Sequence, residues 1–232
     1  MNRYIITAII GICVVLVVVI VFFLKNMHGG NDIRYSVIGD SYSNGEGASY
    51  DESWPSLLTN HLKRQGVAIA LVSNPSITGW TSQQAIDEEL PEYNNSHPTF
   101  ATLQIGVNDW VQGVDVHTFT RNLSLLINAM QKKLPDKHKL VLVTIPDFSV
   151  TPVGERYSEG RNISQGIQQF NTIIMSEGKK RGLLVIDIFP LSQHMKDNKS
   201  LIANDGLHPS AKEYALWQQV IYSLVHTLFT QK

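Results

Sequence analysis

Hydrophobic and polar positions alternate along most of the chain between short apolar runs and longer stretches with helical spacing. Five of the apolar runs predict β-strands, at residues 34–38, 67–72, 100–105, 139–145 and 183–188. Runs such as LVLVTI and LLVIDI are apolar at nearly every position, which is typical of parallel strands covered on both faces. The pattern therefore predicts a parallel sheet enclosed by helices.

The stretches between these runs carry signals for the ends of helices. Ser53 can cap a helix that has Pro55 in its first turn, and Thr81 with Gln84 forms a capping box. We expect the helix that begins after Thr81 to stop at Pro91, because proline interrupts helical hydrogen bonding. Longer helices are expected at residues 117–134, 162–181 and 210–228. The last of these has a predicted buried stripe of Tyr214, Trp217, Val220, Ile221 and Leu224.

Strands that alternate with helices predict a three-layer α/β/α sandwich around a mostly parallel five-stranded sheet, with right-handed crossovers. Residues 33–232 supply this single domain, and a chain of that length can bury a substantial core. We find no internal repeat and no low-complexity segment.

A different pattern precedes this domain. Residues 5–24, IITAIIGICVVLVVVIVFFL, are uncharged, and a helix of twenty residues spans the ~30 Å hydrocarbon layer of a membrane. We predict a transmembrane anchor at residues 1–24, a linker at 25–32, and a single-pass protein whose domain lies outside the cytoplasm. A cleaved signal peptide is the alternative. It is disfavoured because its apolar region is usually about 7–15 residues long and ends in small residues.

Charge and cysteine content exclude several functions. The formal net charge is −1 and no basic stripe is present, so nucleic acid is not an expected partner. The single cysteine, Cys13, lies in the apolar run, which excludes an intramolecular disulfide and a Cys/His zinc cluster. We expect neither a metal nor an organic cofactor.

Four polar segments follow predicted strands. They are GDSYS at residues 39–43, the loop that contains Gly79, GVND at 106–109 and DGLHP at 205–209. Ligands of open parallel sheets bind outside the carboxyl ends of the strands. The four segments are therefore expected at one edge of the sheet, around a common site.

The residue types in these segments suit nucleophilic catalysis. A serine hydroxyl needs a base to remove its proton, and the base needs a third group to orient it. Asp205 is three residues before His208, so its carboxylate can accept a hydrogen bond from one imidazole nitrogen while the other faces Ser41.

Negative charge that develops on a carbonyl oxygen requires donors already in place. The backbone N–H groups of Ser41 and Gly79 and the side-chain amide of Asn108 can supply three, and glycine allows the backbone to approach closely. We expect Asp109 to be an Asx-type turn residue and Asp40 to order the loop around Ser41. The NGEG segment at 44–47 is expected to shape one wall of the cleft.

Together, GDSYS, the glycine in the second loop, GVND and DGLHP resemble the four signature blocks of the SGNH hydrolases, also called the GDSL esterase/lipase family. The resemblance implies a flavodoxin-like fold, Ser41 as the nucleophile, Gly79 and Asn108 as oxyanion donors, and Asp205 and His208 as the remaining catalytic pair. Tyr42 replaces the leucine usual in the family. The G-x-S-x-G elbow of the α/β-hydrolases is absent around Ser41, which argues against that fold.

The predicted function is that of a membrane-anchored serine esterase or lipase that hydrolyses carboxylic esters through an acyl-serine intermediate. Its substrate is a small acyl ester, a lipid or an acylated envelope polymer. An O-acyltransferase that passes the acyl group to a sugar or lipid hydroxyl would use the same three residues and remains an alternative. A catalytically silent, membrane-tethered binding module is a third, and the presence of Ser41, Asp205 and His208 argues against it.

Overall fold

The structure is a computed structural model that describes residues 33–230. The anchor and linker predicted for residues 1–32 lie outside the described residues. Within residues 33–230, the helices are too short or too polar for any of them to cross a bilayer.

Five strands form one sheet. They are β1 (Ile33–Gly39), β2 (Ile69–Ser73), β3 (Phe100–Gln104), β4 (Leu140–Val143) and β5 (Leu184–Ile186), in the order β2-β1-β3-β4-β5. All four pairings are parallel, which confirms the predicted parallel sheet. The chain leaves β1 for β2 on one side and returns to place β3 on the other. The strand order therefore reverses between β1 and β3, and such a point favours a binding crevice.

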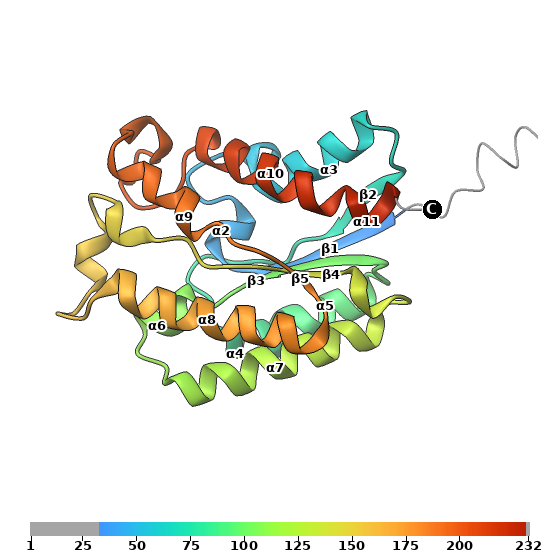
Figure 1. The fold of residues 1–232 in the computed structure, drawn as a ribbon, viewed down its shortest axis with the longest axis horizontal. Coiled ribbons are helices and arrows are strands. Elements are labelled where there is room, and N and C mark those ends of the chain that lie inside the picture. The colour runs from blue at the N-terminus through green and yellow to red at the C-terminus, as the bar shows by residue number, and fades with distance from the viewer. Residues whose placement is uncertain (1–32, 231–232) are drawn as a thin grey trace, which may run out of the picture. The chain divides into compact units, whose positions relative to one another are not determined.

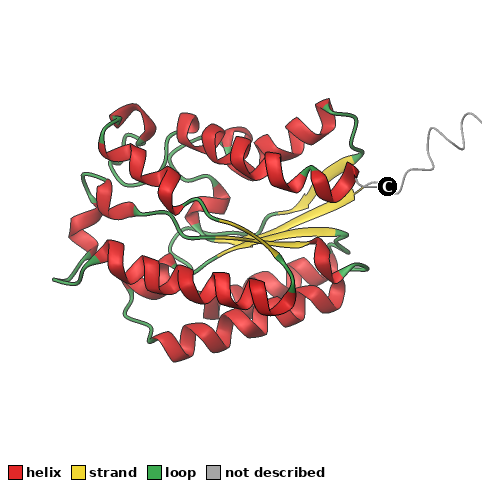
Figure 2. Ribbon diagram, in the orientation of Figure 1, coloured by secondary structure: helices red, strands yellow, loops and turns green. Residues whose placement is uncertain are grey.

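Helices cover both faces of the sheet and make the predicted α/β/α sandwich (Figures 1 and 2). One face carries α2 (Ser41–Asn44), α3 (Trp54–Arg64), α9 (Phe189–Ser192), α10 (Ala211–Val225) and α11 (Thr227–Thr230). The other face carries α4 (Ser82–Gln84), α5 (Leu90–Asn95), α6 (Val107–Val111), α7 (Val116–Lys133) and α8 (Ile163–Arg181).

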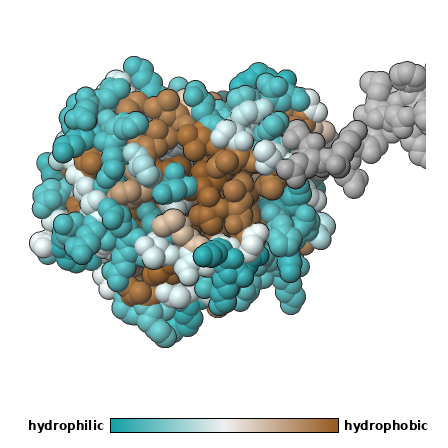
Figure 3. Space-filling view, viewed as in Figure 1, coloured by the Kyte–Doolittle hydropathy of each residue, from teal (hydrophilic) through white to brown (hydrophobic). Residues whose placement is uncertain are grey.

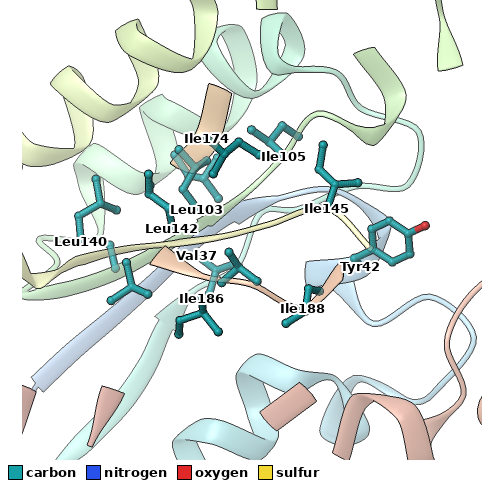
Figure 4. Packing of buried hydrophobic residues seen from close by; sticks show 14 of the residues in the cluster. Val37, Tyr42, Leu103, Ile105, Leu140, Leu142, Ile145, Ile174, Ile186 and Ile188 are labelled. Carbon is teal, nitrogen blue, oxygen red and sulfur yellow. The ribbon is translucent and has the colours of Figure 1, made fainter. Parts of the chain in front are cut away.

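The core lies between these layers. Branched side chains from neighbouring strands, such as Val37, Leu103, Leu142 and Ile186, are almost completely buried and pack together (Figure 4). Because the sheet is buried on both faces, the sequence of its strands is apolar at nearly every position. The sheet is thus a rigid platform from which the loops at its carboxyl edge project.

The edge strand β5 is less protected. Its Leu184 and Val185 are only partly buried. Figure 3 shows an apolar area in the middle of the viewed face, bordered by hydrophilic side chains. An edge strand in an α/β sandwich has a neighbouring strand on one side only, so partial exposure of its side chains is expected.

The prediction that a helix stops at Pro91 was wrong. The helical segment that begins at Ser82 continues through a π-helical turn at Ala85–Glu89 and then through α5 to Asn95. In the π-turn the amide of Leu90 donates to the carbonyl of Ala85, five residues earlier. Proline at 91 has no N–H and its ring crowds the preceding turn, so a widened turn lets the helix pass it.

The predicted final helix was also too long, and one residue of its stripe was misplaced. α10 ends at Val225, and α11 follows as a separate short helix. Tyr214, Trp217 and Ile221 are buried, but Leu224 is 40% exposed. An amphipathic stripe predicts which face is buried, but it does not predict how far the neighbouring layer extends over the end of the helix.

Candidate active site

Ser41 lies at the start of α2, directly after β1. Asp40 caps this short helix: its Oδ1 accepts a hydrogen bond from the amide of Tyr42 at 3.1 Å. The expectation that Asp40 orders this loop is therefore confirmed. Ser41 itself is only 4% exposed. Burial raises the pKa of the Asp40 carboxyl to about 8.

The segment after α2 supports the histidine. Gly47 has φ +90°, and a Cβ at this position would lie 2.8 Å from the carbonyl oxygen of Pro209 and 3.1 Å from Cβ of His208. Only glycine allows the chain to pass so close to His208 in this conformation. The carbonyl of Glu46 accepts a hydrogen bond from the Tyr214 hydroxyl at 2.9 Å. This segment thus contacts the histidine and is held against α10.

His208 and Asp205 form the expected pair. Nδ1 of His208 lies 2.6 Å from Oδ2 of Asp205. Oδ1 of Asp205 accepts hydrogen bonds from the amides of Leu207 at 2.8 Å and His208 at 3.0 Å. Partial burial raises the pKa of Asp205, but these hydrogen bonds outweigh it and the pKa is lowered overall. The carboxylate is therefore ionised and holds one ring nitrogen, which leaves Nε2 of His208 for the pocket.

Gly79 lies in a turn between β2 and α4. The amide of Trp80 donates to the carbonyl of Ile77 at 3.3 Å, and φ of Gly79 is +87°. A Cβ on Gly79 would meet no protein atom within 4 Å. The reason for glycine in the free protein is therefore its backbone conformation rather than the close approach that we expected.

Two side chains hold the Gly79 turn in place, one from the GVND segment and one from just after it. Asn108 donates through Nδ2 to the carbonyl of Trp80 at 2.9 Å, and Gln112 donates through Nε2 to the carbonyl of Gly79 at 3.2 Å. The amide nitrogen of Asn108 carries two hydrogens, and within the described chain only one has a protein acceptor. The other is available to a bound ligand.

The expectation that Asp109 is an Asx-type turn residue was wrong. Its side chain is fully buried and accepts hydrogen bonds from Ser82, through the backbone N–H at 2.7 Å and through the hydroxyl. Burial raises the pKa of Asp109, although the bonds from Ser82 oppose this. Through these hydrogen bonds Asp109 joins the start of α4 to α6, which also holds the end of the loop that carries Gly79.

A pocket of about 160 Å³ joins these segments at the carboxyl edge of the sheet. Four of the five predicted site residues line it: Ser41, Gly79, Asn108 and His208. Asp205 does not reach the pocket, and its side chain, 40% exposed, lies behind His208. The remaining walls are mostly apolar and consist of Tyr42, Thr78, Val107, Val111, Phe148, Tyr157 and Leu207.

The sequence did not indicate Ser82, Gln112 or Glu89 as contributors to this region. Ser82 follows the capping box that the sequence revealed, but its partner Asp109 is 27 residues away. Such long-range hydrogen bonds leave no periodic pattern. Among the described residues there is no group of three or more His, Cys, Asp or Glu side chains that could hold a metal ion.

A buried serine at the switch point of a parallel sheet, in one pocket with a carboxylate-bound histidine, is characteristic of a serine hydrolase. The model of the GDSL-like Lipase/Acylhydrolase family matches residues 37–216. The chain belongs to this family, and the function shared with its relatives is that of a serine ester hydrolase.

Two relatives and one solved structure illustrate the similarity. The chain is 25% identical over 191 residues to an arylesterase of Vibrio mimicus, covering 82% of this chain and 86% of that protein. It is 25% identical over 175 residues to thioesterase 1/protease 1/lysophospholipase L1 of Escherichia coli K12, covering 75% and 74%. The crystal structure of esterase EstA from Pseudoalteromonas sp., inhibited by monoethylphosphonate, has a TM-score of 0.66 at 23% identity and covers 86% of this chain and all of that one.

Proposed function

We propose that this protein is a membrane-anchored esterase in which Ser41 is the nucleophile, His208 the general base and Asp205 the group that orients it. The observation that carries the proposal is the meeting of Ser41 and His208 in one pocket while Nδ1 of His208 is bound to Asp205 at 2.6 Å. A fixed carboxylate keeps the imidazole in the tautomer whose Nε2 can accept a proton.

In the proposed reaction Oγ of Ser41 attacks the ester carbonyl carbon while its proton passes to Nε2 of His208. The carbonyl oxygen becomes negative, and the N–H groups of Ser41 and Gly79 with the free N–H of Asn108 stabilise it. Collapse of this intermediate breaks the bond to the alcohol, which leaves with the proton from His208. Water then attacks the acyl-serine with the help of His208, which releases the acid and restores the Ser41 hydroxyl.

The pocket favours esters with a short acyl chain or a single ring. Its volume is about 160 Å³, and a cavity of about 150 Å³ holds a molecule the size of benzene. The walls contributed by Val111, Phe148 and Leu207 are apolar, which suits a hydrocarbon group rather than a charged one. The relative named arylesterase is compatible with this substrate class.

The membrane anchor rests on the uncharged run at residues 5–24. It predicts a mature protein that retains residues 1–24 and stays with membranes in high salt, because salt does not screen hydrophobic insertion. The weak charge difference across the run favours a domain outside the cytoplasm. A soluble protein whose N-terminus lies beyond Lys25 would show that the run is a cleaved signal.

The decisive experiment uses the purified protein with short acyl and aryl esters. Wild type is expected to release the acid, and a serine-reactive phosphonate is expected to label Ser41 and stop turnover. The Ser41→Ala variant should fold normally, with loss of both activity and label. If the label appears on Ser43, the proposed nucleophile is wrong. Adding alcohols as acyl acceptors shows whether the acyl group passes to water or to an acceptor.

A further inference from the structure

Glu89 has an unusual position for an acidic side chain. It is completely buried in the π-helical turn Ala85–Glu89. Its Oε2 accepts a hydrogen bond from the amide of Gly39 at 2.9 Å, and its Oε1 has no hydrogen-bond partner. Gly39 is the last residue of β1, two residues before Ser41. The carboxyl group therefore contacts the backbone immediately before the proposed nucleophile.

The widened turn at Pro91 explains how Glu89 reaches this site. In the π-turn, Ala85 and Glu89 are buried together, while the intervening Asp87 and Glu88 are exposed. π-Helical turns are rare and occur frequently at functional sites. Here the turn directs one carboxyl to the end of β1 and leaves the adjacent one in solvent.

The end of β1 is confined by its neighbours. A Cβ on Gly39 would lie 2.3 Å from Oγ of Ser43 and 2.8 Å from the carbonyl oxygen of Gln104. α2 and β3 therefore press closely on this residue. β2 pairs with β1 only as far as Ser36, three residues before Gly39. β3 pairs with β1 as far as Gly39, and the bond to Glu89 holds the Gly39 amide beyond the last residue that β2 pairs with.

The buried carboxyl has an energetic cost that indicates a specific role. An apolar side chain of similar size would fill the same space without desolvating a polar group, and desolvation is unfavourable when the hydrogen bonds of that group are incomplete. Since Oε1 is unpartnered, the bond to Gly39 is the one hydrogen bond of the Glu89 side chain within the described residues. An apolar residue at position 89 could not accept the hydrogen bond from the Gly39 amide.

We propose that Glu89 is a positioning residue that holds the end of β1, and through it sets the place of the Ser41 nucleophile. The inference rests on the proposed role of Ser41. Gly39 is clamped by Glu89, and the next residue, Asp40, caps α2. Two buried carboxyls thereby fix the backbone on the approach to Ser41. A misplacement of about 1 Å at a reacting group can reduce turnover by ~10²-fold.

The test compares Glu89→Met, which keeps the volume but removes the acceptor, with Glu89→Gln, which keeps an acceptor oxygen. Two readouts are used: kcat and KM per phosphonate-titrated site, and hydrogen–deuterium exchange of the Gly39 amide. In Glu89→Met we expect kcat to fall roughly 10- to 100-fold with KM within about twofold, and exchange at Gly39 to accelerate. Glu89→Gln should restore most of both.

Glu88→Met is the matched control, because Glu88 lies in the same π-turn but is exposed. It should leave kcat and exchange unchanged. A folded Glu89→Met protein with normal kcat per titrated site, or with unchanged exchange at Gly39, would overturn the proposal. The exchange readout does not depend on ester hydrolysis, so failure of the clamp and failure of the proposed function are distinguishable.

Discussion

Asp109 accepts hydrogen bonds from both the backbone N–H and the hydroxyl of Ser82, and this contact joins α6 to the start of α4. Asn122 on α7 donates to the same hydroxyl at 3.2 Å. The turn that carries Gly79 lies between β2 and Ser82, so it is anchored at its far end by Asp109. Asp109 therefore holds the loop that carries Gly79, the proposed oxyanion donor, and does not itself line the pocket.

Replacing Asp109 with alanine should reduce both stability and turnover. The variant leaves the Ser82 N–H and hydroxyl without this buried acceptor, which costs about 1–3 kcal/mol. A looser Gly79 turn also weakens stabilisation of the negative oxygen, so kcat should fall more than KM rises. Chemical unfolding and steady-state kinetics measure the two effects.

A double-mutant cycle with Ser82→Ala tests the stated cause. If the two residues act through their mutual bonds, the double variant should lose less stability than the sum of the single variants. Ser82→Ala keeps the backbone N–H donor, so additive losses in the free energy of unfolding would show that the hydroxyl bond does not contribute to the effect of Asp109.

The contrast between Asp205 and Asp109 shows what sequence can and cannot predict here. The bond from Asp205 to His208 spans three residues, and local spacing was sufficient to expect it. The bond from Asp109 to Ser82 spans 27 residues and connects two crossovers of the sheet. Local patterns carry no information on such contacts, which depend on how the layers pack.

The fold was predictable for a similar reason. Parallel strands buried on both faces leave apolar runs, and all five runs correspond to strands of the sheet. The π-turn before Pro91 was not predictable, because proline normally ends a helix and the widened turn is an exception. Glu89 was missed for that reason, since an ordinary helix ending there gives no cause to bury an acidic side chain.

Gly79→Ala should destabilise the protein and slow the reaction. The φ of +87° is unfavourable for alanine, by roughly 1–2 kcal/mol, although a Cβ has open space around it. Relief of that strain would move the Gly79 N–H from its proposed place as an oxyanion donor and lower kcat. Gly66→Ala is a matched control: Gly66 has φ +81° and equally open surroundings, and it is not among the residues that line the pocket. Similar stability losses with a kcat loss only at Gly79 are the expected result, and equal kcat values would contradict it.

Stability should decrease as pH rises from 5.5 to 8.5. Burial raises the pKa of Asp40 and of Glu89 to about 8, from ordinary values of 3.8 and 4.5. The carboxylates of Asp40 and Glu92 also raise the pKa of Glu89. The folded protein thus keeps protons that the unfolded chain has released, so the stabilisation is complete below about pH 4 and is lost as pH approaches 8.

Calorimetry across this pH range measures the effect as a falling Tm. Burial also raises the pKa of Glu213, to about 7, and this group contributes in the same direction. Glu89→Gln cannot ionise and should show a shallower decline than wild type. Glu88→Gln should show the wild-type decline, because Glu88 is exposed. A Tm that stays constant or rises between pH 5.5 and 8.5 would contradict the prediction.

Asn108 has one observed contact and one proposed function, and its variants can separate them. One N–H of its amide holds the Trp80 carbonyl, and the other is available for the negative oxygen of the reacting ester. Asn108→Ala should lower kcat by about 10²–10³ with little change in KM, because the lost interaction belongs mainly to the transition state. Asn108→Asp should be at least as damaging, since a carboxylate cannot donate and would repel both the Trp80 carbonyl and the developing charge.

Gln112→Ala is the control for the structural part of this effect. Gln112 holds the adjacent Gly79 carbonyl at 3.2 Å but does not line the pocket. The Gln112→Ala variant loses the hydrogen bond to the Gly79 carbonyl but keeps every proposed donor to the ester oxygen. We expect a lower Tm and a kcat within a few-fold of wild type. If Gln112→Ala reduces kcat as much as Asn108→Ala does, or if Asn108→Asp turns over normally, Asn108 shapes the turn and does not act on the transition state.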